Sequence, residues 1–146
     1  MTILSSREQA CVRVYDKAQW TSKNDMCQKC IKPVAGASRT NCNYYDNREE
    51  LTKMFLARDA FDLEELKTEG QDKVSCPYYA ARSLSKSANI IFCPYNYLID
   101  PNIKERLEIR LEKNIVIIDE AHNIENICRD AQTYIIEWAQ VEKAYE

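Results

Sequence analysis

The sequence predicts an α/β protein whose second half contributes to a parallel sheet. Two short apolar runs, 89–93 and 114–118, have the length and composition of buried strands. A helical pattern follows each run, and this alternation of strand and helix is typical of a parallel sheet. Because buried strands need cover on both faces and neighbours on both edges, we expect the chain to be part of a larger domain.

The first half of the chain predicts helices only from residue 47 onward. Residues 1–45 show little periodicity and contain several turn formers, so we expect mostly irregular backbone there. The spacing of apolar residues then predicts an amphipathic helix over 47–58. Its apolar face consists of Leu51, Met54 and Phe55.

Two further helices are indicated by their end signals. Asp62 is a suitable N-cap for a helix over 63–69, with Gly70 at the C′ position that follows it. Pro77 suits the first turn of a helix that runs to about residue 87.

The second half predicts one helix over 101–113, although period-two alternation competes with the helical pattern there. A clearer helix follows residue 123, because its apolar residues repeat at i, i+3, i+4 and i+7. This stripe consists of Ile124, Ile127, Cys128, Ala131, Ile135 and Trp138.

Composition excludes several classes of protein. The 146 residues are 45% hydrophobic and 29% charged, as expected of a globular chain. No apolar run approaches the roughly 18 residues of a membrane span, and the first residues lack the basic and apolar regions of a secretory signal. The two glycines are too few for a P-loop or a GxGxxG phosphate-binding loop.

Charge is distributed unevenly along the chain. The net charge is +4 over residues 1–42, −2 over 43–86 and −5 over 87–146. A basic first third fits a surface that touches a phosphate backbone on one side, and chance unevenness is an equally good explanation.

Seven cysteines are the most unusual feature of the composition, and they lie at positions 11, 27, 30, 42, 76, 93 and 128. Their odd number and the missing secretory signal argue against a disulfide framework. Five of them fall in the first 76 residues, in segments poor in other apolar residues, which favours metal binding. We expect Cys93 and Cys128 to be buried small hydrophobic residues.

The strongest local signal is the run from Ile115 to His122, in which an apolar strand ends in two carboxylates. The carboxyl edge of a parallel sheet is where α/β folds bind ligands. Asp119 is suited to hold Mg²⁺ through water, and Glu120 to orient a water that attacks a γ-phosphate. His122, the only histidine, would sense that site. The alternative is a capped strand end with a solvated acidic turn.

This run has the Walker B form known as the DEAH box, and the chain from Ile3 to about Tyr134 resembles the XPD-like iron–sulfur DNA helicases of superfamily 2. The resemblance is strongest to the branch of the Fanconi anaemia group J and telomere-elongation-regulating helicases. The matching segments are Leu4–Cys11, Cys42–Tyr45, Asp62–Leu66, Cys76–Arg82, Ile90–Asp100 and Val116–Ile124.

The resemblance implies part of a RecA-like P-loop motor domain with an inserted, mostly helical and loop [4Fe–4S] domain. Residues 1–86 would form the iron–sulfur cluster domain, and 87–146 part of motor domain 1 with the DEAH box. The implied activity is ATP-dependent 5′→3′ DNA unwinding in the nucleus, in DNA repair and genome maintenance. Implied partners are ATP with Mg²⁺, DNA at a junction of single strand and duplex, and repair proteins, with no membrane.

The resemblance also implies a set of cluster ligands. Cys11, Cys42 and Cys76 fall on the family pattern, and the remaining ligand is Cys30 or Cys27. We favour Cys30 because its lead-in and its distance to Cys42 are more similar to the family. Four soft thiolates suit an iron–sulfur cluster. A Cys₄ zinc site is the alternative, because two cysteines separated by two residues have zinc-knuckle spacing.

Contacts with DNA are implied for Arg7, Tyr95 and Asn96. Arg7 would either contact DNA phosphate or brace the cluster loop, and the family permits both. Tyr95 and Asn96 follow the strand that resembles motif Ib. Four tyrosines flank two of the cluster ligands and would shield the cluster from water; they are Tyr44, Tyr45, Tyr78 and Tyr79.

A helicase of this class also needs a P-loop lysine and an arginine finger from a second motor domain. Neither is recognisable in this sequence, so we expect an internal fragment that hydrolyses no ATP alone. The alternative is a catalytically inactive module that binds DNA or a partner through an iron–sulfur or zinc site.

Overall fold

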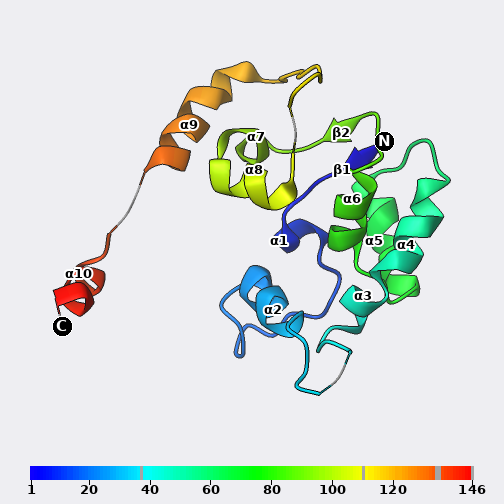
Figure 1. The fold of residues 1–146 in the computed structure, drawn as a ribbon, viewed down its shortest axis with the longest axis horizontal. Helices are drawn as coiled ribbons and strands as arrows, with labels where there is room; N and C mark the ends of the chain where they lie inside the picture. The colour runs from blue at the N-terminus through cyan, green and yellow to red at the C-terminus, as the bar shows by residue number, and fades with distance from the viewer. Residues whose placement is uncertain (37, 110, 134–135, 146) are drawn as a thin grey trace. The chain divides into compact units, whose positions relative to one another are not determined.

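A computed structural model describes residues 1–36, 38–109, 111–133 and 136–145, apart from the side chain of residue 139. The chain forms two compact units, unit 1 from Met1 to Cys93 and unit 2 from Pro94 to Glu146. The expected division into domains 1–86 and 87–146 stays a prediction. Unit 1 contains most of the helices and the sheet (Figure 1).

Unit 1 contains a small parallel sheet of two strands, β1 (Thr2–Ile3) and β2 (Ile91–Phe92). Thr2 N donates to Ile90 O at 2.9 Å, and Leu4 N donates to Phe92 O at 2.8 Å. Parallel pairing is therefore present, but the strand partner of β2 comes from residues that the sequence predicted to be irregular. The expected burial of β2 is wrong, because Ile91 and Phe92 are 39% and 54% exposed.

The run 114–118 is not a strand in this structure, so that prediction is also wrong. Ile115 and Ile117 are 92% and 89% exposed. A strand needs hydrogen-bonding neighbours at its edges, and an apolar strand needs cover on both faces. In the described part of unit 2 no element pairs with this run, which therefore stays exposed.

The first 45 residues contain three short helices, so the expectation of irregular backbone is only partly right. These helices are α1 (Arg7–Ala10), α2 (Lys23–Cys30) and α3 (Asn43–Asp46). Ser6 and Gln9 form a capping box at α1, and Ser22 accepts a hydrogen bond from the backbone of Asp25 at the start of α2. Apolar periodicity did not indicate these short helices, and the capping residues were the local sequence signals that could have predicted them.

The three helices predicted between residues 47 and 87 are confirmed as α4 (Arg48–Leu56), α5 (Leu63–Asp72) and α6 (Pro77–Leu84). Both α4 and α5 pack against α6, and α6 also contacts β1 (Figure 1). Edge-to-face packing of Phe55 on Phe61 extends this core, with ring centroids 4.7 Å apart. The buried apolar residues of this part are Leu51, Phe55, Phe61, Leu66, Ala80, Ala81 and Leu84.

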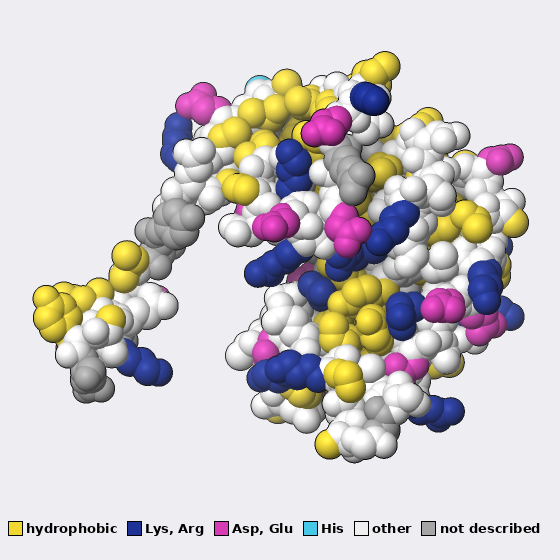
Figure 2. Space-filling model, in the orientation of Figure 1, with side chains coloured by type: hydrophobic (Ala, Val, Ile, Leu, Met, Phe, Trp, Pro, Cys, Tyr) yellow, Lys and Arg dark blue, Asp and Glu magenta, His cyan; other side chains and the backbone are white. Residues whose placement is uncertain are grey.

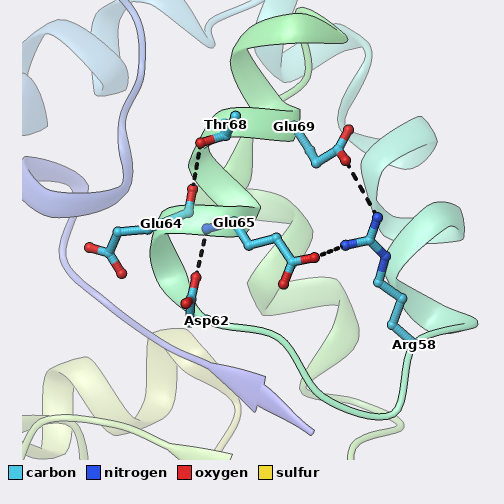
Figure 3. A network of polar contacts seen from close by, with 6 residues as sticks. All are labelled: Arg58, Asp62, Glu64, Glu65, Thr68 and Glu69. Carbon is cyan, nitrogen blue, oxygen red and sulfur yellow. Dashed lines mark hydrogen bonds and ion pairs between the residues drawn. The ribbon is translucent and has the colours of Figure 1, made fainter.

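The start of α5 is held by a polar network (Figure 3). Asp62 is the N-cap, as predicted, and its carboxylate accepts a hydrogen bond from Glu65 N at 2.7 Å. Arg58, just after α4, bridges to Glu65 and to Glu69 of the next turn. The Glu64 side chain points away from this arginine (Figure 3). The network thus ties the end of α4 to the first two turns of α5.

Gly70 lies inside α5 and does not end the helix, so its assignment to the C′ position is wrong. A Cβ atom at Gly70 would lie 2.5 Å from Pro77 Cγ and 2.9 Å from Ser75 O. The glycine is therefore explained by the close approach of α5 to the first turn of α6 and not by a helix end.

Unit 2 begins with α7 (Asn96–Ile99) and α8 (Pro101–Leu107), which pack together. The helix expected over 101–113 is confirmed as far as Leu107, and Glu108 ends it with a positive φ of 55°. A 3₁₀ turn (Ala121–Asn123) then leads into α9 (Ile124–Gln132), and α9 contacts α7.

The predicted apolar stripe after residue 123 is confirmed only within α9. The backbone becomes extended at Thr133, so Trp138 belongs to a separate helix, α10 (Trp138–Tyr145), and is 73% exposed. Ile135 lies outside the described residues. Cys93 and Cys128 are half-buried, where full burial was expected. Within the described residues, no helix has the length and apolar character needed to span a bilayer.

We expect Gly70→Ala to destabilise unit 1 by about 1–3 kcal/mol, because the added methyl overpacks the junction of α5 with Pro77. Urea unfolding of the chain, followed by circular dichroism, measures this change. Gln71→Ala, at the exposed next position of the same helix, is the control. Equal stability of the two variants would contradict this explanation of Gly70.

Candidate functional site

Five cysteines from four segments line one pocket in unit 1. Cys11 follows α1, Cys27 and Cys30 lie on α2, and Cys42 and Cys76 are the N-cap residues of α3 and α6. The structure therefore brings together all five cysteines that the sequence singled out for metal binding. Figure 2 shows hydrophobic side chains gathered on this face of the molecule, with Lys and Arg side chains around them.

Hydrogen bonds to backbone atoms hold the cysteine-bearing segments in place. Lys23 at the start of α2 donates to the carbonyl of Cys11 at 3.0 Å, which ties α2 to the end of α1. The carbonyl of Cys30 accepts from Asn41 N at 2.9 Å, and Thr40 Oγ1 accepts from Cys42 N at 3.1 Å. The two ends of the loop between α2 and α3 are thereby fixed beside the pocket.

The thiols of the pocket are shielded from water. Burial raises the pKa of Cys76 to about 12, and burial also raises the pKa values of Cys11 and Cys27. Without a metal or another positive charge to stabilise the thiolate form, these thiols are therefore protonated at neutral pH. A metal that binds here must displace their protons, and its own charge provides the compensation.

Arg7 is one of two arginines that lie next to the thiols. Its guanidinium donates to Asn24 Oδ1 at 2.9 Å and to Tyr79 Oη at 3.1 Å, and it lies 4.4 Å from the ring centroid of Tyr78. Burial lowers the pKa of Arg7, but the tyrosines and Cys27 raise it, and the net direction is upward. These contacts link α1 to α2 and α6, as expected of a brace. Contact of Arg7 with DNA stays a prediction.

Arg13 is the second arginine, and only its position two residues after Cys11 could have pointed to it in the sequence. It donates to Asn41 O at 2.8 Å. Burial lowers the pKa of Arg13, but Cys30 and Cys42 beside it raise the pKa, and the net direction is upward. Arg13 is thus placed to balance negative charge on these two sulfurs.

Tyrosines form one wall of the pocket. Tyr45 and Tyr79 line it and pack edge to face with ring centroids 4.7 Å apart. Tyr78 packs on Tyr79 in the same way at 5.0 Å, and the Arg48 guanidinium lies 4.3 Å from the ring centroid of Tyr45. The four tyrosines expected beside the ligands therefore lie near the pocket, and Tyr44 packs against the two apolar clusters that contain Cys42 and Cys76.

The donor set of the pocket consists of sulfur. The described lining residues include cysteine and methionine but no histidine, aspartate or glutamate. Sulfur-only sites select soft metals and iron–sulfur clusters. In the described part of the chain, no three His, Cys, Asp or Glu side chains stand in an arrangement that would hold a metal ion. The residues present fit a cluster by their chemistry, and the assignment stays a proposal.

The acidic run forms a second candidate site, in unit 2. Asp119 accepts a hydrogen bond from Glu120 N at 3.0 Å, and His122 Nδ1 lies 3.2 Å from Glu120 Oε2. Glu120 has a positive φ of 49°, and the side chains of Glu120 and His122 are 67% and 72% exposed. The two carboxylates are therefore free to meet a cation from solvent.

Tyr95, one of the two predicted DNA-contacting residues of unit 2, lies near this acidic pair. Burial, together with the charges of Asp119 and Glu120, raises the pKa of Tyr95. Asn96 is exposed at the start of α7. The structure thus brings Tyr95 toward the acidic run, a proximity that the sequence did not predict.

Comparison with known proteins shows the family of this chain. The DEAD_2 family model matches residues 1–141, so the chain belongs to the DEAD_2 family. Among its relatives is the Fanconi anemia group J protein homolog of Gallus gallus, which is 39% identical over 152 aligned residues. The Regulator of telomere elongation helicase 1 of Rattus norvegicus is 40% identical over 133 residues.

The similarity covers nearly all of this chain but little of its relatives. The aligned regions span 100% of the chain and 12% of the chicken protein, and 90% of the chain and 10% of the rat protein. The Regulator of telomere elongation helicase 1 homolog of rice, Oryza sativa subsp. japonica, is 39% identical, with 92% of the chain and 13% of the relative covered. The chain therefore spans about a tenth of the length of these relatives.

We expect Arg7→Lys to destabilise unit 1 by about 1–3 kcal/mol, because lysine keeps the charge but cannot bond Asn24 and Tyr79 together while stacking on Tyr78. Urea unfolding measures the change, with the exposed Arg39→Lys as the control. A stability loss no larger than that of the control would show that Arg7 is not a brace.

Proposed function

We propose that this chain is part of an ATP-dependent 5′→3′ DNA helicase that acts in genome maintenance in the nucleus. One observation carries the proposal: five cysteines from four segments line one pocket that contains no histidine, aspartate or glutamate among its described residues, in a member of a family with relatives named as helicases. In the proposed protein, unit 1 supplies an iron–sulfur domain inserted in a RecA-like motor domain, and unit 2 supplies part of that motor domain.

The pocket is proposed to hold a [4Fe–4S] cluster through Cys11, Cys42, Cys76 and one cysteine of α2. The sequence favours Cys30 for this position, with Cys27 as the alternative. When bound, the cluster would link the four segments covalently through its irons. The chain's own residues exclude water with the tyrosine wall and place Arg7 and Arg13 near the thiolates. This domain is proposed to act where duplex DNA meets single strand.

The acidic run is proposed to serve ATP hydrolysis in the complete protein. Asp119 would hold Mg²⁺ through water, Glu120 would orient and polarise the attacking water, and His122 would relay the state of the site. The contact of His122 with Glu120 supports this relay. The exposure of the apolar run 114–118 supports the proposal that this run is a strand of a parallel sheet in the complete protein. Burial of such a run would need further strands and helices around it.

The DNA path is proposed to involve Arg7, Tyr95 and Asn96. Asn96 is exposed and Tyr95 is half-buried, so both can be reached from solvent. Repair proteins are proposed as further partners, by analogy with the relatives. ATP and Mg²⁺ are proposed as ligands of the complete protein only, because the two glycines leave no room for a P-loop in this chain.

Anaerobic purification of the chain, followed by absorption spectroscopy and analysis of iron, sulfide and zinc, tests the cluster. We expect a brown protein with about four iron and four sulfide per chain, because four thiolates hold a [4Fe–4S] cluster. Refolding in air-free buffer without iron is the control for adventitious colour. A colourless protein with one tightly bound zinc would refute the cluster.

In the complete protein, we expect Glu120→Gln to lower ATP hydrolysis by about 10²–10⁴-fold, because the amide cannot polarise the attacking water. Binding of ATP and folding should stay unchanged, since the shape of the side chain is conserved. Glu125→Gln, at an exposed position on α9, is the matched control. Equal hydrolysis by both variants would refute the role of Glu120.

A further inference from the structure

The backbone of Cys42 is held by two polar residues, Thr40 before it and Asp46 after it. Thr40 Oγ1 accepts a hydrogen bond from Cys42 N at 3.1 Å, and Cys42 O accepts one from Asp46 N at 3.1 Å. The two residues also bond to each other. Thr40 Oγ1 donates to Asp46 Oδ1 at 2.9 Å, and Thr40 N donates to Asp46 Oδ2 at 3.1 Å. Thr40 and Asp46 thus close a ring of hydrogen bonds around Cys42, the Cys42 clamp.

Helix α3 cannot hold its first residue in the usual way. An N-cap side chain normally accepts a hydrogen bond from the backbone of its own helix. The N-cap of α3 is Cys42, whose side chain makes no such bond and lines the cysteine pocket. The helix has only four residues, and a helix of this length is unstable alone. The placement of the Cys42 sulfur therefore depends on contacts such as those of the clamp.

Asp46 acts on Cys42 through the hydroxyl of Thr40. A hydroxyl that donates to a carboxylate forms a charge-assisted hydrogen bond, and this polarisation makes its oxygen a stronger acceptor. The hydroxyl oxygen accepts from the N–H of Cys42. Both side chains of the clamp are half-buried, so water competes less for these bonds than at an exposed site. The charge of Asp46 therefore strengthens the bond between Thr40 and Cys42.

The far end of α3 is fixed to the segment that carries Cys76. Asn47 directly follows the helix, and its carbonyl accepts from Ser75 Oγ at 2.8 Å. The Asn47 side chain donates to Val74 O at 3.2 Å. Ser75 is fully buried and directly precedes Cys76. Hydrogen bonds at both ends of α3 therefore fix Cys42 relative to the segment of Cys76.

We propose that Thr40 and Asp46 are positioning residues, which hold the Cys42 sulfur in the cysteine pocket in the orientation that a bound metal centre needs. Neither is among the described residues that line the pocket, so both act through Cys42 and not as ligands. Outer groups that orient a metal ligand typically account for about 10–100-fold in metal affinity. The effect on metal binding rests on the proposed function, whereas the placement of Cys42 by the clamp does not.

The test uses the 146-residue chain, purified without oxygen, as the unchanged protein and as variants. Thr40→Val removes the hydroxyl, Thr40→Ser keeps it, and Asp46→Asn leaves a single oxygen to accept the two bonds from Thr40. Thr68→Val is the matched control, because the Thr68 hydroxyl bonds only within α5, to Glu64 O. Release of iron to an excess of chelator is followed by visible absorption, and far-ultraviolet circular dichroism checks that each variant is folded.

We expect Thr40→Val to release iron about 10–100-fold faster than the unchanged chain, the size of effect typical of a lost outer partner. Asp46→Asn should also release iron faster, while Thr40→Ser and Thr68→Val should match the unchanged chain. A Thr40→Val variant no faster than Thr68→Val would overturn the proposal, and so would a Thr40→Ser variant as fast as Thr40→Val. If Thr40→Val fails to fold, Asp46→Asn decides, with the exposed Asp72→Asn as its control.

A measurement without metal separates this proposal from the proposed function. If the unchanged chain binds no iron, the proposed function is refuted, and alkylation by iodoacetamide, located by mass spectrometry, then tests the clamp. We expect Cys42 to react faster in Thr40→Val than in Thr40→Ser, because its backbone is no longer held. Equal alkylation of Cys42 in the two variants would overturn the clamp as well.

Discussion

The burial of thiols in the cysteine pocket is the constraint on which the first part of unit 1 depends. Helices α1, α2 and α3 have between four and eight residues. Isolated helices of this length are unstable in water, since nucleation costs more than so few hydrogen bonds return. Their ends meet at the pocket, where cysteines, tyrosines and two arginines supply the tertiary contacts. The contacts at this pocket therefore hold all three helices in place together.

Helix α6 joins this pocket to the apolar core of the unit. Its N-cap, Cys76, faces the other cysteines, and its later residues Ala80, Ala81 and Leu84 are buried in the part of the unit where α4 and α5 pack. The contact of Gly70 with Pro77 sets the distance between α5 and the start of α6. The position of the Cys76 thiol is thus determined by the packing of α4 and α5 on α6, which involves no other cysteine.

Local features were predictable from the sequence wherever their partners lie nearby. The N-cap at Asp62 and the buried face of α4 follow from residues within one or two turns. The convergence of five cysteines was suggested by chemistry and by resemblance, while their exact neighbours depend on tertiary folding. The run 114–118 has a strand-like sequence, yet it is exposed because its burial needs elements that the described residues do not supply. Gly70 was wrongly assigned to a helix end, because the need for glycine there comes from its close approach to Pro77, which lies beyond the following turn.

The parallel pairing of β1 with β2 has a consequence for biosynthesis. Thr2 is paired with Ile91, so strand β1 is synthesised almost ninety residues before its partner exists. At a translation rate of roughly 5–20 residues per second, that delay is about 4–18 s. Cys76 is likewise synthesised more than sixty residues after Cys11, so the cysteine pocket cannot assemble until most of unit 1 has been made.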